Sequence, residues 1–181
     1  MPLLVGGMID DLGFSEQQAG YVAAIEGAGL VLASLVTALW IRKVSWTKAL
    51  AVAFIATALI NIVSANLVEF LPFLLLRFLA GFSAGTIFAL TVAALGDNRE
   101  PDRAFGIAQI VQGAMMFVAF AGGAYILAHW SVSELYYMLA AASLLMLLTL
   151  VRYPSQGAQR VVPHGVEGDT PNYTRLIWVG L

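Results

Sequence analysis

The chain has 181 residues, of which 60% are hydrophobic and 11% are charged, and its formal net charge is −2 at pH 7. A soluble domain of this length could not cover so much apolar surface, so the composition indicates a polytopic membrane protein with an all-α fold. The small net charge gives no indication of a nucleic-acid partner, and the absence of cysteine excludes disulfides and cysteine-ligated metals.

The chain opens with a short apolar stretch and an acidic loop. Residues 1–8 are too few to cross a bilayer, so we interpret residues 1–12 as the end of a membrane helix and the outer loop after it. Ser15 is a suitable N-cap for the helix that follows.

Five long apolar runs come next. A helix needs about 20 apolar residues to cross the hydrocarbon core of a bilayer. Within residues 13–154 we therefore predict membrane spans over residues 17–41, 47–68, 70–96, 102–129 and 133–153. Trp40 and Trp46 beside the first basic loop, and Tyr136, Tyr137 and Tyr153 at the ends of the fifth span, are typical of interfacial aromatic residues.

The last part of the chain changes character. Residues 155–175 are polar and contain several Gly and Pro, which is typical of a solvated linker. Residues 176–181 read LIWVGL and are expected to begin another membrane helix.

The basic residues predict the orientation. Those outside the spans all lie on one side of the predicted membrane: Arg42, Lys43, Lys48, Arg99, Arg103, Arg152, Arg160 and Arg175. The other side carries only acidic residues: Asp10, Asp11, Glu16, Glu69 and Glu134. By the positive-inside rule the basic side and the linker are cytoplasmic, and the protein is expected in a plasma membrane such as the bacterial inner membrane.

Two ionisable residues, Glu26 and Arg77, lie inside the predicted spans at similar depth. Because burial of a charge in hydrocarbon is expensive, we expect them to pair or to face a polar cavity. Glu26 could take and release a proton, and Arg77 could bind an anionic solute or tune Glu26. Three other readings stay open: a static structural pair, two groups in water that never meet, and an Arg77 that extends to the outer headgroups.

Small and amide residues suggest further contacts. Gly20, followed by Ala24 and Ala28, predicts one helix-packing face, and Gly81 with Gly85 predicts another beside Arg77. Gln109 and Gln112 share a helix face and need hydrogen-bond partners in hydrocarbon. They are expected to line a cavity, to contact a second helical half, or to bond between helices.

The cytoplasmic loops carry Arg42, Lys43, Asp97 and Arg103. Asp97 could form an ion-pair latch with Arg42 or Lys43, and the alternative is a set of solvated charges that never pair.

Residues 70–106 resemble the fourth and fifth helices of the major facilitator superfamily of transporters. Arg77 followed by Gly81 matches the arginine and glycine pattern of the fourth helix, and Asp97 with the run PDRAFG at 101–106 matches the short inner loop. Residues 13–20, GFSEQQAG, resemble the outer loop and the start of the second helix.

The sequence also departs from the family pattern. The loop at 38–48 lacks the usual glycines and has Arg42 where an aspartate is usual, which puts a gating role of this loop in doubt. The fifth helix has no Gly-Pro pattern of the kind found in drug–proton antiporters of the family.

The resemblance implies a secondary transporter of twelve helices that moves a small solute by alternating access. On that plan the chain is the N-terminal half: the end of helix one, helices two to six, the central linker and the start of helix seven. Such a partial chain is not expected to transport alone. The expected partners are the lipid bilayer, an unidentified small-molecule substrate and the C-terminal half of the same transporter. No cofactor or metal is expected, and a proton or another ion is the candidate coupling species.

Two other classes of membrane protein are the alternatives. A membrane scaffold or subunit without transport activity would leave Glu26 and Arg77 as costly features without a role. A membrane-embedded enzyme would need a catalytic set within the spans, and the sequence has no His-Glu-x-x-His, Ser–His or paired-Asp pattern there. We therefore expect a protein that is not an enzyme.

Overall fold

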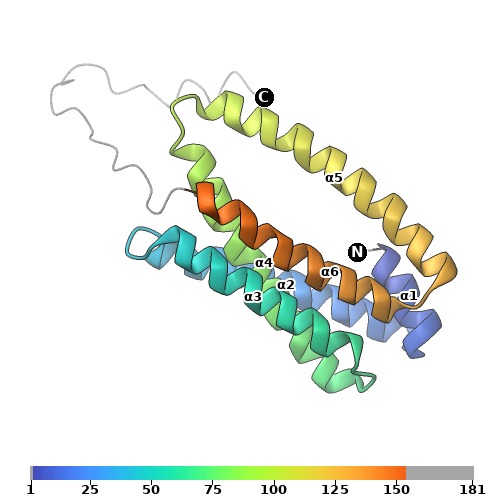
Figure 1. Cartoon of the computed structure of the whole chain (residues 1–181). Coiled ribbons are helices and arrows are strands. Elements are labelled where there is room, and N and C mark those ends of the chain that lie inside the picture. Colours follow the sequence, from blue (N-terminus) through green and yellow to red (C-terminus); the bar gives the residue numbers. More distant parts are fainter. Residues whose placement is uncertain (1, 154–181) are drawn as a thin grey trace, which may run out of the picture.

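The computed structural model describes residues 2–153. The predicted linker at 155–175 and the predicted helix start at 176–181 lie outside the described residues. The elements in order are α1 (Pro2–Leu12), α2 (Glu16–Trp40), α3 (Trp46–Ala65), α4 (Phe70–Gly96), α5 (Pro101–His129), α6 (Val132–Met146) and the 3-10 turn η1 (Leu147–Arg152) (Figure 1). Residues 2–153 contain helices and turns but no strand.

Five of these helices are long and apolar enough to cross a membrane. They are α2, α3, α4, α5, and α6 extended through η1 to Val151. Their ends differ from the predicted spans by only a few residues, except that the last turns of the fifth span are 3-10 rather than α-helical. The all-α polytopic architecture is confirmed.

Local sequence signals fix several helix starts. The Ser15 hydroxyl accepts from the backbone N–H of Gln18 at 3.2 Å, and the Gln18 side chain accepts from the Ser15 N–H at 2.9 Å, which forms a capping box at the start of α2. Pro101 lies in the first turn of α5, where its missing N–H costs nothing. Glu134 similarly accepts from the backbone N–H of Ser131 at 3.2 Å at the start of α6.

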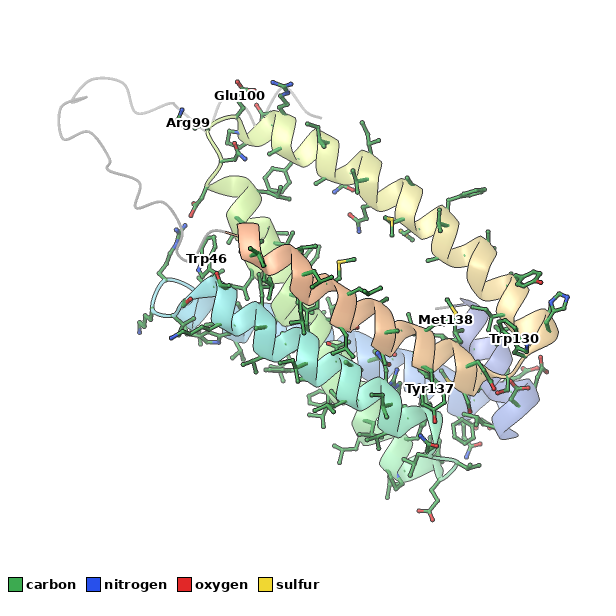
Figure 2. All side chains as sticks on the ribbon, in the orientation of Figure 1. Trp46, Arg99, Glu100, Trp130, Tyr137 and Met138 are labelled. Atoms are coloured by element: carbon green, nitrogen blue, oxygen red, sulfur yellow. The ribbon has the colours of Figure 1, made fainter. Side chains whose placement is uncertain are left out.

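The bundle has a basic end and an acidic end. The basic end carries Arg42, Lys43, Lys48, Arg99 and Arg103 together with Asp97, Glu100 and Asp102, and the acidic end carries Asp10, Asp11, Glu16, Glu69 and Glu134. Figure 2 shows Trp46, Arg99 and Glu100 at the basic end, and Trp130 and Tyr137 toward the opposite end.

The closest helix contact is between α2 and α4. Added Cβ atoms would collide with carbonyl oxygens of the facing helix at Gly29, Gly81 and Gly85. Glu26 of α2 lies opposite Gly81 of α4, and Leu30, one turn further along α2, lies opposite Gly85, one turn further along α4. Residue numbers therefore rise in the same direction along both helices, so α2 and α4 run parallel. Glycine here allows the two backbones to touch, as in other membrane helix pairs.

The other helices pack around this pair. α3 packs on α4 and α6, and α1 contacts α2, α5 and α6. α5 stands apart from the bundle over most of its length (Figure 1), and its only fully buried residues are Gly123 and Ile126 near the acidic end.

Two apolar clusters hold the ends of the bundle. The cluster at the acidic end consists of Met8, Phe14, Val22, Phe73, Val132 and Tyr136, and the cluster at the basic end consists of Trp46, Leu50, Leu90 and Leu150. Trp46 is 1% exposed and its indole N–H donates to the Ile41 carbonyl at 2.6 Å, and Tyr136 is 0% exposed, so both rings are buried in the bundle and do not face lipid. Their position at the depth of the membrane interface stays a prediction.

Candidate functional site

Arg77 lies in the interior of the bundle, where it joins α4 to α3. Its side chain is 2% exposed. Its Nη2 donates to Ser64 Oγ at 2.6 Å and to Asn61 Oδ1 at 3.2 Å. Asn61 and Ser64 are three residues apart on α3, so they share one helix face and together accept from the same nitrogen.

Aromatic rings enclose the guanidinium. The Arg77 Cζ lies 4.7 Å from the Tyr136 ring centroid and 5.5 Å from the Phe73 ring centroid, within the range of cation–π attraction. Phe73 also packs edge-on against Tyr136 and Phe14, with centroids 6.0 and 5.5 Å apart. Arg77 is therefore held inside the bundle and does not extend to the headgroups.

Glu26 is the second ionisable group in the interior. It is half-buried on α2, and its Oε2 is buried without a hydrogen-bond partner. The Arg77 Nε is also buried without a partner. Among residues 2–153 no ion pair joins Glu26 to Arg77, because the guanidinium is turned toward α3 and α6 instead. The expected pairing is thus not present in this structure.

The glycines predicted to mediate packing have different surroundings. Gly81 faces the backbone of Glu26, and Gly85 faces Leu30 and Ala33. Gly20 is exposed, and an added Cβ there would meet nothing within 4 Å. Within the described residues Gly20 is therefore not a packing position, because α2 buries a different face: Ala19, Val22, Gly29, Ala33 and Thr37.

Gln109 and Gln112 are both exposed and line one groove between α4 and α5. The groove has a volume of about 870 Å³. Its α4 wall includes Phe88 and Thr91, and its α5 wall includes Phe105. None of the described residues that line it is charged.

An ion pair joins the C-terminal ends of α2 and α4 at the basic end of the bundle. Arg42 donates from Nη1 and Nη2 to the two carboxylate oxygens of Asp97, at 2.7 and 3.1 Å. Arg42 is 59% exposed and Asp97 is 11% exposed. The hydrogen bond with Asp97 raises the pKa of the Arg42 guanidinium above its usual value, so Arg42 stays charged. Arg42 also lies 5.8 Å from the Trp46 ring centroid.

The other basic residues of these loops lie outside this pair. Arg103 bonds Glu100 at 3.3 Å within the first turn of α5, and both side chains are largely exposed. Among the described residues Lys43 forms no ion pair. Of the four predicted latch residues, the structure thus brings Arg42 and Asp97 together.

The model of the Major Facilitator Superfamily matches residues 1–178 of this chain. The chain belongs to the Major Facilitator Superfamily. Comparisons with curated proteins and with solved structures gave no match. Members of this superfamily are membrane transporters rather than enzymes, and the five apolar helices agree with an integral, multi-pass membrane protein.

Several residues around Arg77 in this superfamily member were not predicted. Asn61, Ser64 and Tyr136 are its direct contacts, and the i, i+3 spacing of two polar residues in an apolar helix was an available signal for Asn61 and Ser64. Asp11 was also missed: its carboxylate accepts from the Val132 N–H at 2.5 Å, which ties α1 to the start of α6. In residues 2–153 no cluster of His, Asp or Glu could hold a metal ion.

Proposed function

We propose that this protein is a secondary active transporter that moves a small solute across the membrane by alternating access. The observation that carries the proposal is the interior polar cluster in a bundle of this superfamily. Arg77 and Glu26 each keep a buried polar atom without a partner. A purely structural ion pair would be expected to satisfy its buried atoms, because each unsatisfied group costs about 1–3 kcal/mol.

The groove between α4 and α5 is the proposed solute site. Its volume of about 870 Å³ lies in the range of small-molecule sites. Gln109 and Gln112 supply amide groups that both donate and accept hydrogen bonds, and the walls are otherwise mainly apolar. This combination suits a solute with polar groups on an apolar body.

Glu26 and Arg77 are the proposed coupling residues. Glu26 would bind and release a proton or exchange its interaction with another ion, and Arg77 would respond to that change because it lies one helical turn before Gly81, which faces the Glu26 backbone. This mechanism requires no cofactor. The coupling ion supplies the driving force.

The Arg42–Asp97 pair is the proposed latch of the basic end. A bidentate arginine–carboxylate pair has a defined geometry, and because the Arg42 side chain is 59% exposed, the pair can open toward solvent. We propose that the basic end faces the cytoplasm of the cell, with the protein in the plasma membrane.

Alternating access moves one helical bundle against another around a central site. Residues 2–153 form one such bundle. We therefore propose that a second helical half of the transporter is the working partner of this bundle, and that residues 1–181 produced alone do not transport.

The second candidate function is a membrane scaffold without transport activity. The exposed apolar surface of α5 is the feature that favours it, since a helix that stands apart could bind another membrane protein. Uptake by membrane vesicles distinguishes the two functions.

The experiment uses vesicles from cells that express this chain together with the proposed second helical half, incubated with a mixture of small solutes and analysed by mass spectrometry. The transporter proposal predicts at least one solute whose uptake saturates and depends on an ion gradient. Uptake equal to that of vesicles without the protein, for every solute and gradient, would support the scaffold.

A further inference from the structure

A second groove lies at the basic end, between α2, α3 and α4. Its volume is about 640 Å³. The residues that line it are Trp40, Val44, Ser45, Lys48, Ala49, Val52, Ala53, Ala56, Phe82, Ser83 and Thr86. This groove is separate from the one lined by Gln109 and Gln112.

The polar residues of the α3 wall gather at one end of this groove. Ser45 and Lys48 lie at the start of α3 together with Trp40 at the end of α2, whereas Val52, Ala53 and Ala56 continue along α3 toward the middle of the bundle. Lys48 is exposed, and within the described part of the chain no carboxylate is paired with it. The groove therefore has a cationic mouth and a mostly apolar body.

The length of the groove matches one leaflet of a bilayer. From Lys48 to Ala56 α3 rises about 12 Å, and half of the hydrocarbon core is about 15 Å. A molecule bound along the groove would place a polar group at the membrane surface and an apolar chain beside Val52 and Ala56.

We propose that this groove binds an anionic phospholipid, with the phosphate at Lys48 and one acyl chain along α3. The charge of Lys48 is complementary to the headgroup, and the neighbouring basic residues Arg42 and Lys43 attract anionic lipid to the same surface. Trp40 at the mouth is suited to the headgroup level of the membrane. This inference does not depend on the proposed transport function.

The bundle offers a natural comparison at its acidic end. A groove of about 540 Å³ there is lined by Ile25, Leu71, Pro72, Leu74, Leu75 and Phe78. Within residues 2–153 no basic or hydroxyl side chain lines it, so it can hold acyl chains but cannot distinguish an anionic headgroup from a zwitterionic one.

Native mass spectrometry of the purified protein with added lipid tests the proposal. The probes are phosphatidylglycerol and phosphatidylcholine with the same acyl chains. We expect phosphatidylglycerol to bind more tightly, and Lys48→Gln to weaken its binding about fivefold, as expected for one lysine near a membrane surface. Lys43→Gln is the matched control, because it removes the same charge from the same end of the bundle outside the groove, and we expect less than a twofold effect.

Two further variants test the apolar body. Ala56→Trp should fill the groove and prevent binding, whereas Leu75→Trp in the acidic-end groove should not. Should Ala56→Trp not fold, a photoreactive benzophenone side chain at Val52, which is 68% exposed, provides a second measurement. It should form adducts with phosphatidylglycerol in preference to phosphatidylcholine, and the same group at Leu75 should show no preference.

Three results would overturn the proposal. Equal effects of Lys48→Gln and Lys43→Gln would mean that only the general charge of the loop attracts lipid. Equal binding of phosphatidylglycerol and phosphatidylcholine would show that the charge of the headgroup does not contribute to binding. Adducts of the Val52 probe with another protein segment, and none with lipid, would show that a helix of the transporter covers the groove.

Discussion

Arg77 and Ser64 join α4 to α3 through a hydrogen bond of 2.6 Å between the guanidinium Nη2 and the hydroxyl Oγ. This bond is made in the interior of a membrane bundle, where water cannot replace it. Asn61 accepts from the same nitrogen and Tyr136 covers the guanidinium, so three helices hold one charged side chain.

The first prediction concerns the acceptor at Ser64. Ser64→Ala should lower the free energy of unfolding by about 2 kcal/mol, because a bond to a buried charged donor is lost. Ser143→Ala is the control, since the Ser143 hydroxyl donates only to the Leu139 carbonyl of its own helix, at 2.8 Å. It should change stability by less than about 0.5 kcal/mol. Thermal unfolding in detergent measures both, and equal effects would mean that the bond to Arg77 contributes nothing specific.

The second prediction distinguishes the contribution of the Tyr136 ring to stability from that of its hydroxyl. The hydroxyl is buried without a partner, so Tyr136→Phe should leave stability unchanged or slightly raised. Tyr136→Leu removes the aromatic face above Arg77 and should cost at least about 1 kcal/mol. The same unfolding assay compares the two variants. If Tyr136→Phe proved more harmful than Tyr136→Leu, the hydroxyl would have a partner in the working protein.

The third prediction compares two glycines. Gly81→Ala should destabilise the bundle strongly, because the new Cβ would collide with the Glu26 carbonyl and push α2 from α4. Gly20→Ala should be neutral or stabilise α2 by up to about 1 kcal/mol, because alanine has the higher helix propensity and space is open there. The yield of folded protein and its melting temperature report both effects. A damaging Gly20→Ala would indicate that another helix of the transporter packs against that face.

The fourth prediction concerns Arg42 and Asp97. Asp97 is 11% exposed beside Arg42, so Asp97→Arg removes the ion pair, brings two like charges together and should lower the melting temperature. It should also disturb the basic end, which thiol labelling of a cysteine introduced at Ala94 would detect, since the chain has no native cysteine.

Combining Asp97→Arg with Arg42→Asp restores opposite charges and should return the labelling rate of the Ala94 cysteine toward the original value. High salt should speed labelling of the original pair. If the changes in labelling rate caused by the two single substitutions simply added in the double variant, the pair would not control this end of the bundle.

The membrane spans could be predicted because each is a long apolar run bounded by charged or polar residues. Composition and length suffice for that inference. Ser15 was also predictable, because a capping box depends only on residues three apart in the sequence. The Arg42–Asp97 pair was anticipated as one of two alternatives, since both residues lie in loops on the same side of the membrane.

The rotation of each helix could not be predicted. In a membrane helix both the lipid-facing side and the interior side are apolar, so hydrophobic periodicity does not mark the buried face. That is why Gly20 was assigned to a packing face that is exposed, and why Arg77 was expected to meet Glu26 rather than Ser64 and Asn61. The hydrogen bond of Asp11 to Val132 joins residues far apart in the sequence, and no local pattern indicates it.

The most direct test of the central claim is solute uptake by vesicles that contain the proposed second helical half together with the original chain, Arg77→Ala or Ser143→Ala in equal amounts. The account predicts that Arg77→Ala inserts into the membrane but takes up solute no faster than empty vesicles, while Ser143→Ala transports normally. Normal uptake by Arg77→Ala would contradict the account, because Arg77 would then be a structural residue and not part of the coupling mechanism.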